Sequence, residues 1–127
     1  MNEIVAPASI APPAANYSHG IVSSAGSRML HTAGTVPARN DGTVPVDLAE
    51  QAELVWATLR EIVTAAGFAM RDIVSVTTYV VVGSSAAQVM AVRDRVLGGH
   101  RPASTLVFVP ALVRPDWKVE ISVIAAQ

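Results

Sequence analysis

The chain has 127 residues, a length typical of one domain, and we expect a single domain over residues 1–127. Hydrophobic residues make up 51% of the sequence and charged residues only 15%, so apolar surface should remain for a subunit interface to cover. The net charge of -1 and the lack of any run of Lys and Arg argue against nucleic acid as a partner, and the absence of cysteine excludes disulfides and thiolate metal ligands.

The N-terminal part of the sequence predicts little regular structure. Residues 1–16 are rich in Ala and Pro and should be extended or loop, without the pattern of a secretion signal. Residues 17–34 predict two short strands around a turn at Ala25-Gly26-Ser27. No apolar segment reaches the roughly 20 residues that span a bilayer, so we expect a cytoplasmic protein with no membrane partner.

A long helix should follow the loop that contains the turn signal Asn40-Asp41-Gly42. Asp47 is a good N-cap and forms a capping-box pattern with Glu50, while Gly67 suits the position just past the helix end. The apolar residues at helical spacing should face the core, and they are Leu48, Ala52, Val55, Leu59, Ile62 and Ala66.

The second half of the chain predicts a strand, a helix and two more strands. Residues 72–82 are dense in β-branched side chains, which is typical of a central buried strand. A second helix should begin after Ser85 and end at Gly98-Gly99. Further strands are predicted at residues 104–110 and 118–126, the last with alternating apolar side chains.

The order of these elements is ββαβαββ, which predicts an α+β fold with one sheet and both helices packed on one face. Nothing in the chain is then left to cover the other face of the sheet. We therefore expect other subunits to bury that face, in agreement with the excess of apolar residues.

Several stretches of the sequence together resemble the RidA/YjgF family of small imine and enamine deaminases. The segment ANYSHG is similar to the family's Pro-Tyr-Ser-x-Gly, and HTAGTVP is similar to its Ser-Gly-Gln-Ile-Pro. The pair Glu50-Gln51 and the stretches AAGFAMRDIVSVTTYV and KVEISVIA fall in register with the family. RPASTLV resembles its Pro-Ala-Arg-Ser-x-Val with one difference. Each motif is weak alone, but their order and spacing from Ile4 to Ala125 make the resemblance strong.

The resemblance implies a chorismate-mutase-like fold and a homotrimer in which the sheets form a barrel, with small-molecule clefts between adjacent subunits. Carried over residue by residue, Tyr17 would line the cleft and Glu120 would position the hydrolytic water. Ser104 stands where family members have an arginine that binds the substrate carboxylate. A guanidinium offers two parallel donors to a carboxylate, whereas a hydroxyl offers one. Met90 stands where the family often has an asparagine, so both differences make the cleft less polar.

Ordinary deamination of 2-imino acids such as 2-aminoacrylate is therefore not expected of this chain. Arg101 lies three residues before Ser104, roughly 10 Å along an extended chain, and whether it replaces the missing guanidinium stays open. We add Thr105 and His19 to the predicted substrate-binding residues. His19 is two residues from Tyr17, so both side chains would point the same way in an extended segment.

Other charged residues are assigned no function from the sequence. Arg93 and Arg95 on the second helix should lie in solvent, and Glu120 without the resemblance would be an ordinary solvated strand residue. His31 and His100 lack acidic neighbours at metal-ligand spacing, so we expect no metal ion, and no motif predicts a cofactor.

Three functions remain open at this point. The first is an enzyme that acts on an enamine, imine or related carbonyl compound by deamination, hydrolysis or tautomerisation, with Glu120 as the base. The second is a ligand-binding or regulatory trimer without turnover. The third, a ribonuclease or chaperone, is the weakest because the chain lacks basic clusters.

Overall fold

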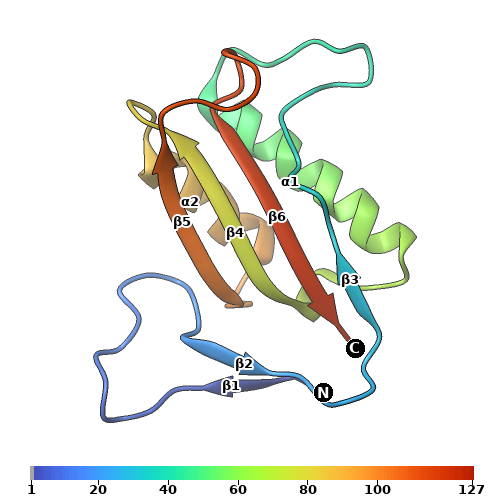
Figure 1. Cartoon of the computed structure of the whole chain (residues 1–127), viewed down its shortest axis with the longest axis vertical. Coiled ribbons are helices and arrows are strands. Elements are labelled where there is room, and N and C mark those ends of the chain that lie inside the picture. The colour runs from blue at the N-terminus through green and yellow to red at the C-terminus, as the bar shows by residue number, and fades with distance from the viewer. Residues whose placement is uncertain (1) are drawn as a thin grey trace.

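The computed structural model describes residues 2–127 and contains two long helices beside a sheet (Figure 1). The strands are β1 (Glu3–Val5), β2 (Gly20–Val22), β3 (Met29–His31), β4 (Ile73–Val81), β5 (Ala103–Val109) and β6 (Val119–Ala126). The helices are α1 (Leu48–Ala65) and α2 (Ala86–Leu97), and a short 3-10 turn, η1 (Met70–Asp72), leads into β4.

The main sheet has the strand order β3-β6-β4-β5, with β4 and β5 parallel and the other neighbours antiparallel. The parallel pair is connected through α2, which is the usual way to join parallel strands. As predicted, β4 occupies a central position. The strand β5 forms an edge of the sheet, and its outer side has no neighbouring strand within the described chain.

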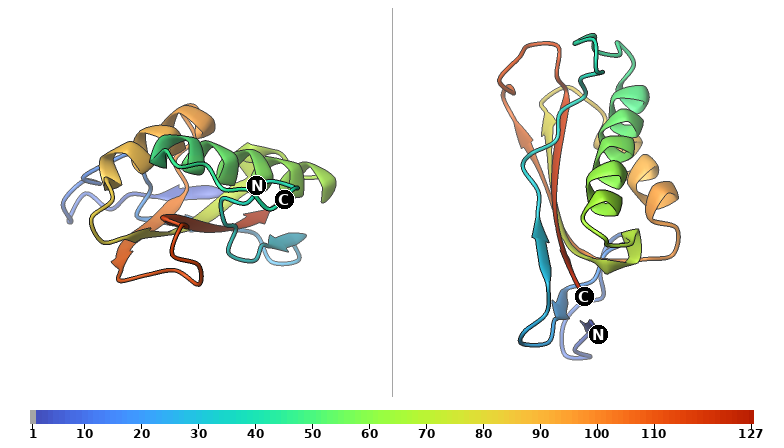
Figure 2. Two further views of the ribbon diagram at one scale, coloured as in Figure 1. Left: turned by 90° about the horizontal axis from the view of Figure 1, so that it is seen from above. Right: turned by 90° about the vertical axis from the view of Figure 1, so that its right-hand side faces the viewer.

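Both helices lie on one side of the sheet, and the other side carries no helix (Figure 2). This layering confirms the predicted α+β fold class. None of the helices formed by residues 2–127 combines the length and the apolar character needed to cross a membrane.

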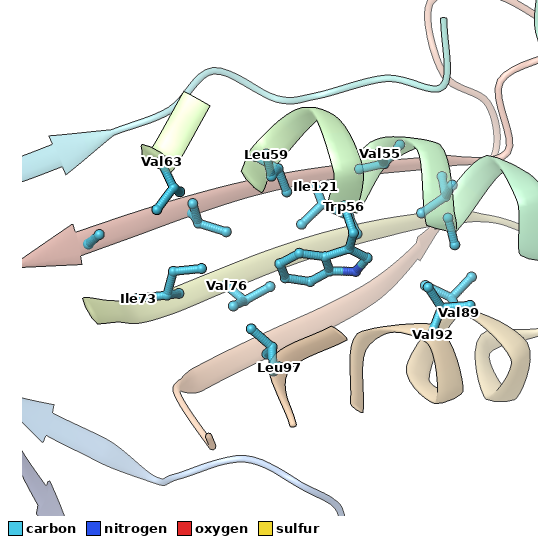
Figure 3. Close-up of a cluster of buried hydrophobic side chains, with 14 of the residues drawn as sticks. Val55, Trp56, Leu59, Val63, Ile73, Val76, Val89, Val92, Leu97 and Ile121 are labelled. Carbon is cyan, nitrogen blue, oxygen red and sulfur yellow. The ribbon is translucent and has the colours of Figure 1, made fainter. Parts of the chain in front are cut away.

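The hydrophobic core fills the space between the helices and the sheet (Figure 3). Trp56 of α1 is fully buried there, with its ring between α1, the sheet and α2. On β6 the buried residues alternate with partly exposed ones, so Val119, Ile121 and Val123 face the helices. Glu120 therefore faces the opposite side of the sheet.

The predicted caps define where the helices begin. The Asp47 side chain accepts a hydrogen bond from the Glu50 backbone N–H at 3.1 Å, and the Ser85 hydroxyl accepts one from the Gln88 N–H at 3.2 Å. The predicted apolar stripe of α1 is wrong at one position, because Ile62 is 37% exposed while Val63 is fully buried. The buried residues Val55, Leu59 and Val63 are spaced four residues apart, which is slightly more than one helical turn. The buried face therefore passes through Val63 and leaves Ile62 beside it, toward solvent.

The N-terminal strands pair differently from the prediction. The turn near Gly26 forms, but β2 pairs with β1 and β3 pairs with β6, so no hairpin joins β2 to β3. The segment Glu3–Val5 was expected to be extended or loop, and it pairs with β2 in a small second sheet. The main sheet consequently has four strands.

Candidate functional site

Two of the predicted site residues, Ser104 and Glu120, lie on opposite faces of the sheet. Ser104 is in register with Val76, whose side chain is buried beneath the helices, so Ser104 faces the helix layer. Glu120 is in register with Tyr79 and faces the open side. The two positions are two strands apart and three residues apart along the strands, which corresponds to roughly 14 Å. Within one chain they do not form a common site.

Glu120 lies in a groove on the open face. The groove has a volume of about 490 Å³ and is lined by Tyr79, Val109, Glu120 and the loop residues 111–113. The Glu120 carboxylate has no ion-pair partner among residues 2–127. A carboxylate free of such a partner, beside an apolar wall, is available to accept a proton or to orient a water molecule.

Gly34 provides the space that the Glu120 side chain occupies. After β3 the chain continues beside β6, where the backbone of Thr35 exchanges two hydrogen bonds with Ile121, at 2.7 and 3.0 Å. A Cβ atom built on Gly34 would lie 2.8 Å from Cδ of Glu120. Carbon atoms normally approach to about 3.5 Å, so any side chain at position 34 would displace the carboxylate.

A buried glutamine fixes the loop that leads into β6. Gln51 of α1 is 1% exposed, and its side-chain amide donates hydrogen bonds to the backbone carbonyls of Pro45 and Asp116, both at 2.8 Å. Its carbonyl oxygen accepts a hydrogen bond from the Lys118 N–H at 2.9 Å. The sequence had marked Gln51 only as part of a motif. The structure shows that it ties the start of β6, and hence Glu120, to the helix layer.

Thr105 lies on the same face as Glu120. It is in register with Thr77 of β4, which is in register with Ser122 of β6, so three hydroxyl groups form a row across the open face. Ser122 is two residues from Glu120 on the same strand face. This places Thr105 away from Ser104, although the two are adjacent in sequence.

The expectation that Arg93 lies in solvent is wrong, because the residue is 4% exposed. Its side chain extends from α2 toward β5, where Nη1 donates a hydrogen bond to the Ser104 hydroxyl at 3.3 Å. A four-bond stem allows arginine to bury its aliphatic part and carry the guanidinium to a distant partner. The helix pattern gave no signal for this contact, because Arg93 was counted with the polar face.

Tyr17 and His19 come from the N-terminal loop and reach the start of β5. The intervening Ser18 is buried, and it donates from its backbone to Pro102 O at 3.1 Å and from its hydroxyl to Arg101 O. The rings of Tyr17 and His19 meet edge to face with centroids 5.6 Å apart, which confirms that both point the same way. His19 is exposed and its Nε2 lies 2.9 Å from Ala11 O.

Met90 and Arg101 complete the predicted set. Met90 is partly buried on α2, three residues before Arg93 and therefore on the same side of the helix. Arg101 is exposed, and it lines a small pocket that also includes Asn16 and Asp94. The guanidinium that contacts Ser104 belongs to Arg93.

The predicted site residues of one chain thus form two separate groups. The first group, at the start of β5, has Tyr17, Met90, Arg93 and Ser104, and it offers a cation and hydrogen-bond donors. The second group is the groove with Glu120, and it offers a base. In residues 2–127 no three His, Asp or Glu side chains cluster closely enough to hold a metal ion.

Known proteins share both the sequence and the fold. Residues 8–127 match the family model described as Endoribonuclease L-PSP. The chain is 35% identical over 126 residues to the 2-iminobutanoate/2-iminopropanoate deaminase of Escherichia coli K12, a match that covers 96% of this chain and 92% of the relative. The structure of YyfB from Yersinia pestis, a protein of the conserved Rid family, is similar with a TM-score of 0.88 and 30% identity, covering 99% of this chain and 98% of YyfB. Escherichia coli TdcF, whose crystal structure contains bound serine, has a TM-score of 0.74 and 30% identity over 98% of each chain.

Proposed function

The chain belongs to the RidA/YjgF family, whose model carries the name of endoribonuclease L-PSP, and from this premise we propose that it hydrolyses the C=N bond of a small imine. The observation that carries the proposal is the Glu120 carboxylate, which has no ion-pair partner in residues 2–127 and lies in a groove where Gly34 leaves it room. The curated relative from Escherichia coli is named for the deamination of two small imines, which supports this reaction class.

The proposed reaction adds one water molecule and releases ammonia. Glu120 takes a proton from water as the oxygen attacks the imine carbon, and the electron pair of the C=N bond moves to nitrogen, which receives that proton from Glu120. Glu120 then takes the hydroxyl proton of the resulting carbinolamine and passes it to the amino nitrogen, and the C–N bond breaks as the C=O bond forms. The products are a carbonyl compound and ammonia, and the carboxylate is regenerated.

We further propose that the site lies between subunits of a homotrimer. The open face carries apolar side chains that nothing in the described chain covers, including Val107, which is 41% exposed. Tyr17, Met90 and Ser104 of one subunit would then meet Glu120 of a neighbour across the interface. This arrangement would bring together two groups of residues that lie apart within one subunit.

Imine hydrolysis fits the chain better than RNA cleavage, although the family model is named for an endoribonuclease. An RNA-binding surface needs clustered Lys and Arg residues, and the sequence has a net charge of -1 without a basic run. Small imines need no such surface.

The test replaces Glu120 with glutamine, which keeps the shape and removes the base. Imines generated in situ by an amino-acid dehydratase would be supplied, and ammonia release would be compared with the rate in buffer alone. We expect Glu120→Gln to lower turnover about a hundredfold or more. Glu61→Gln, which changes an exposed carboxylate on α1, is the matched control and should not change turnover.

Two results would contradict the proposal. Equal turnover of Glu120→Gln and the wild type would remove the catalytic assignment of Glu120. A wild-type protein that binds small carbonyl compounds without accelerating imine hydrolysis would instead be a non-catalytic ligand-binding trimer.

A further inference from the structure

A second pocket lies between the N-terminal strands and one end of the main sheet. It has a volume of about 560 Å³, larger than the groove at Glu120, and no residue lines both. The strands β1 and β2 form one wall, and in Figure 1 they lie below the end of the sheet where β4 begins and β6 ends. Small-molecule sites in proteins are typically clefts of about 300–1,000 Å³. The pocket therefore has the size of a ligand site, separate from the proposed catalytic groove.

The inner walls of this pocket are apolar. Ile4 and Ile21 are cross-strand partners in the small sheet, and both line the pocket. On the other side lie Ile73 and Ala126, which belong to the main sheet and are fully buried. Ile4 is 65% exposed, so a ligand that covers it would remove apolar surface from water. The walls thus favour a ligand with an apolar body.

Hydrogen bonds hold the walls together without a ligand. The Asn2 side chain donates from Nδ2 to Ala126 O at 3.1 Å and accepts from the Ser23 hydroxyl at 2.8 Å, which ties β1 to β6 and to the end of β2. His100 also lines the pocket, and its Nε2 lies 2.6 Å from Ile73 O. A carbonyl oxygen only accepts, so this contact assigns the donor proton to Nε2. Because the walls are fixed in advance, a ligand would not have to order them when it binds.

Two opposite charges lie at the rim of the pocket. Arg71 and Asp72 are adjacent in η1, and both line the pocket. Neither forms an ion pair within residues 2–127. Asp72 Oδ2 accepts a hydrogen bond from the Ala69 N–H at 2.7 Å, which leaves Oδ1 for another donor. A guanidinium suits a carboxylate and a carboxylate suits an ammonium group, so the two charges together suit a zwitterion.

We propose that this pocket binds a free α-amino acid with an apolar side chain. The carboxylate of the ligand accepts hydrogen bonds from Arg71, and its ammonium group donates to Asp72. Its side chain lies against Ile4 and Ile21. An apolar acid would instead bring its carboxylate near Asp72 without an ammonium group to balance it, and like charges repel. The amino acid is bound here and not turned over, so the site goes beyond the proposed hydrolysis.

The test compares three compounds that share one apolar group. L-Phenylalanine carries both charges, 3-phenylpropanoate lacks the ammonium group, and 2-phenylethylamine lacks the carboxylate. Each would be titrated into the 15N-labelled full chain and followed by NMR at the backbone amides of Ile21 and Ile73. We expect L-phenylalanine to bind at least fivefold more tightly than either of the other compounds, with its largest shifts at these amides.

Two variants assign each charge of the ligand to one residue. Arg71→Gln should weaken L-phenylalanine binding at least fivefold and leave 2-phenylethylamine unchanged, because that compound has no carboxylate. Asp72→Asn keeps an acceptor for the Ala69 N–H. It should weaken L-phenylalanine by a similar factor and should not weaken 3-phenylpropanoate, which has no ammonium group. Arg60→Gln changes an exposed arginine on α1 outside the pocket, and as the matched control it should bind all three compounds as the wild type does.

A further pair of variants tests the apolar wall. Ile4→Asn should weaken all three compounds by a similar factor, since all of them carry the phenyl group. Ile10→Asn is the control, because Ile10 is 48% exposed and does not line the pocket. Both residues are exposed, so neither change should unfold the protein.

Four results would overturn this site. One is the absence of L-phenylalanine binding at millimolar concentrations, and another is equal affinity for the three compounds, which would leave the two charges without a role. Shifts at Tyr79 and Glu120 in place of Ile21 and Ile73 would put the compounds in the other groove. Loss of L-phenylalanine binding in Glu120→Gln would do the same, because Glu120 does not line this pocket. The proposed hydrolysis is tested by turnover, so either proposal can fail without the other.

Discussion

Gly34 is expected to control the activity of Glu120 without contacting the substrate. In Gly34→Ala the added Cβ would lie 2.8 Å from Cδ of Glu120, about 0.7 Å closer than two carbon atoms normally approach. The carboxylate must then move by about 1 Å or change rotamer. A misplacement of that size costs on the order of a hundredfold in rate. We expect turnover of an imine substrate to fall by about that factor.

The same change should have little effect on stability. Gly34 does not have a positive φ, so alanine adopts the backbone conformation without strain. Moving Glu120 off its preferred rotamer costs about 0.5–1.5 kcal/mol. The reduced entropy of the unfolded chain offsets about 0.4–1 kcal/mol of this. The melting temperature should therefore stay within a few degrees of the wild type.

Ammonia release and thermal unfolding would be measured on four variants, which are Gly34→Ala, Gly99→Ala, Glu120→Gln and the double variant of Gly34→Ala with Glu120→Gln. Gly99→Ala is the control, because it also lacks a positive φ and has no atom within 4 Å of the added Cβ. Adding Gly34→Ala to Glu120→Gln should lower turnover no further, since both changes act through one carboxylate. Wild-type turnover in Gly34→Ala, or a full additional loss in the double variant, would refute the reasoning.

Three further predictions concern the fold and the assembly. Trp56→Ala should lower the free energy of unfolding by about 3–5 kcal/mol in urea titrations, whereas Trp56→Phe should cost far less because Trp56 Nε1 is a buried donor without a partner in residues 2–127. Gln51→Leu should destabilise by several kcal/mol in the same assay, since three backbone groups would lose their partner, at about 1–3 kcal/mol each. Light scattering at micromolar concentration should give the mass of a homotrimer, and a stable monomer would contradict the site between subunits.

The main elements could be predicted because each has a local cause. The helix after Asp47 and the strand at β6 follow from a cap and an alternating pattern, which act over a few residues. The pairing of β2 and β3 could not be predicted in this way. The turn at Gly26 forms, but the choice of partner strand depends on contacts made far away along the chain.

Only part of the candidate site could likewise be predicted from the sequence. Glu120 was proposed because the resemblance to the family marks it, whereas the alternating pattern of β6 alone would make it an ordinary solvated residue. The contact of Arg93 with Ser104 was missed because a helical pattern assigns charged residues to solvent, whereas only the packed structure shows that α2 lies against β5. Gly34 was missed as well, since nothing in the sequence indicates which side chain of β6 it faces.

The separation of Tyr17 from Glu120 within one chain leads to a last prediction, on subunit complementation. If a substrate touches both residues, Tyr17 and Glu120 must come from different copies of the chain. In a cyclic trimer mixed from Tyr17→Ala and Glu120→Gln subunits, one of the three sites then combines the two native residues. Random mixing by co-expression should therefore restore roughly a quarter of the wild-type turnover, although each variant alone turns over only slowly. If the two residues acted within one subunit, no mixture would contain a complete site and turnover would stay at the level of the single variants.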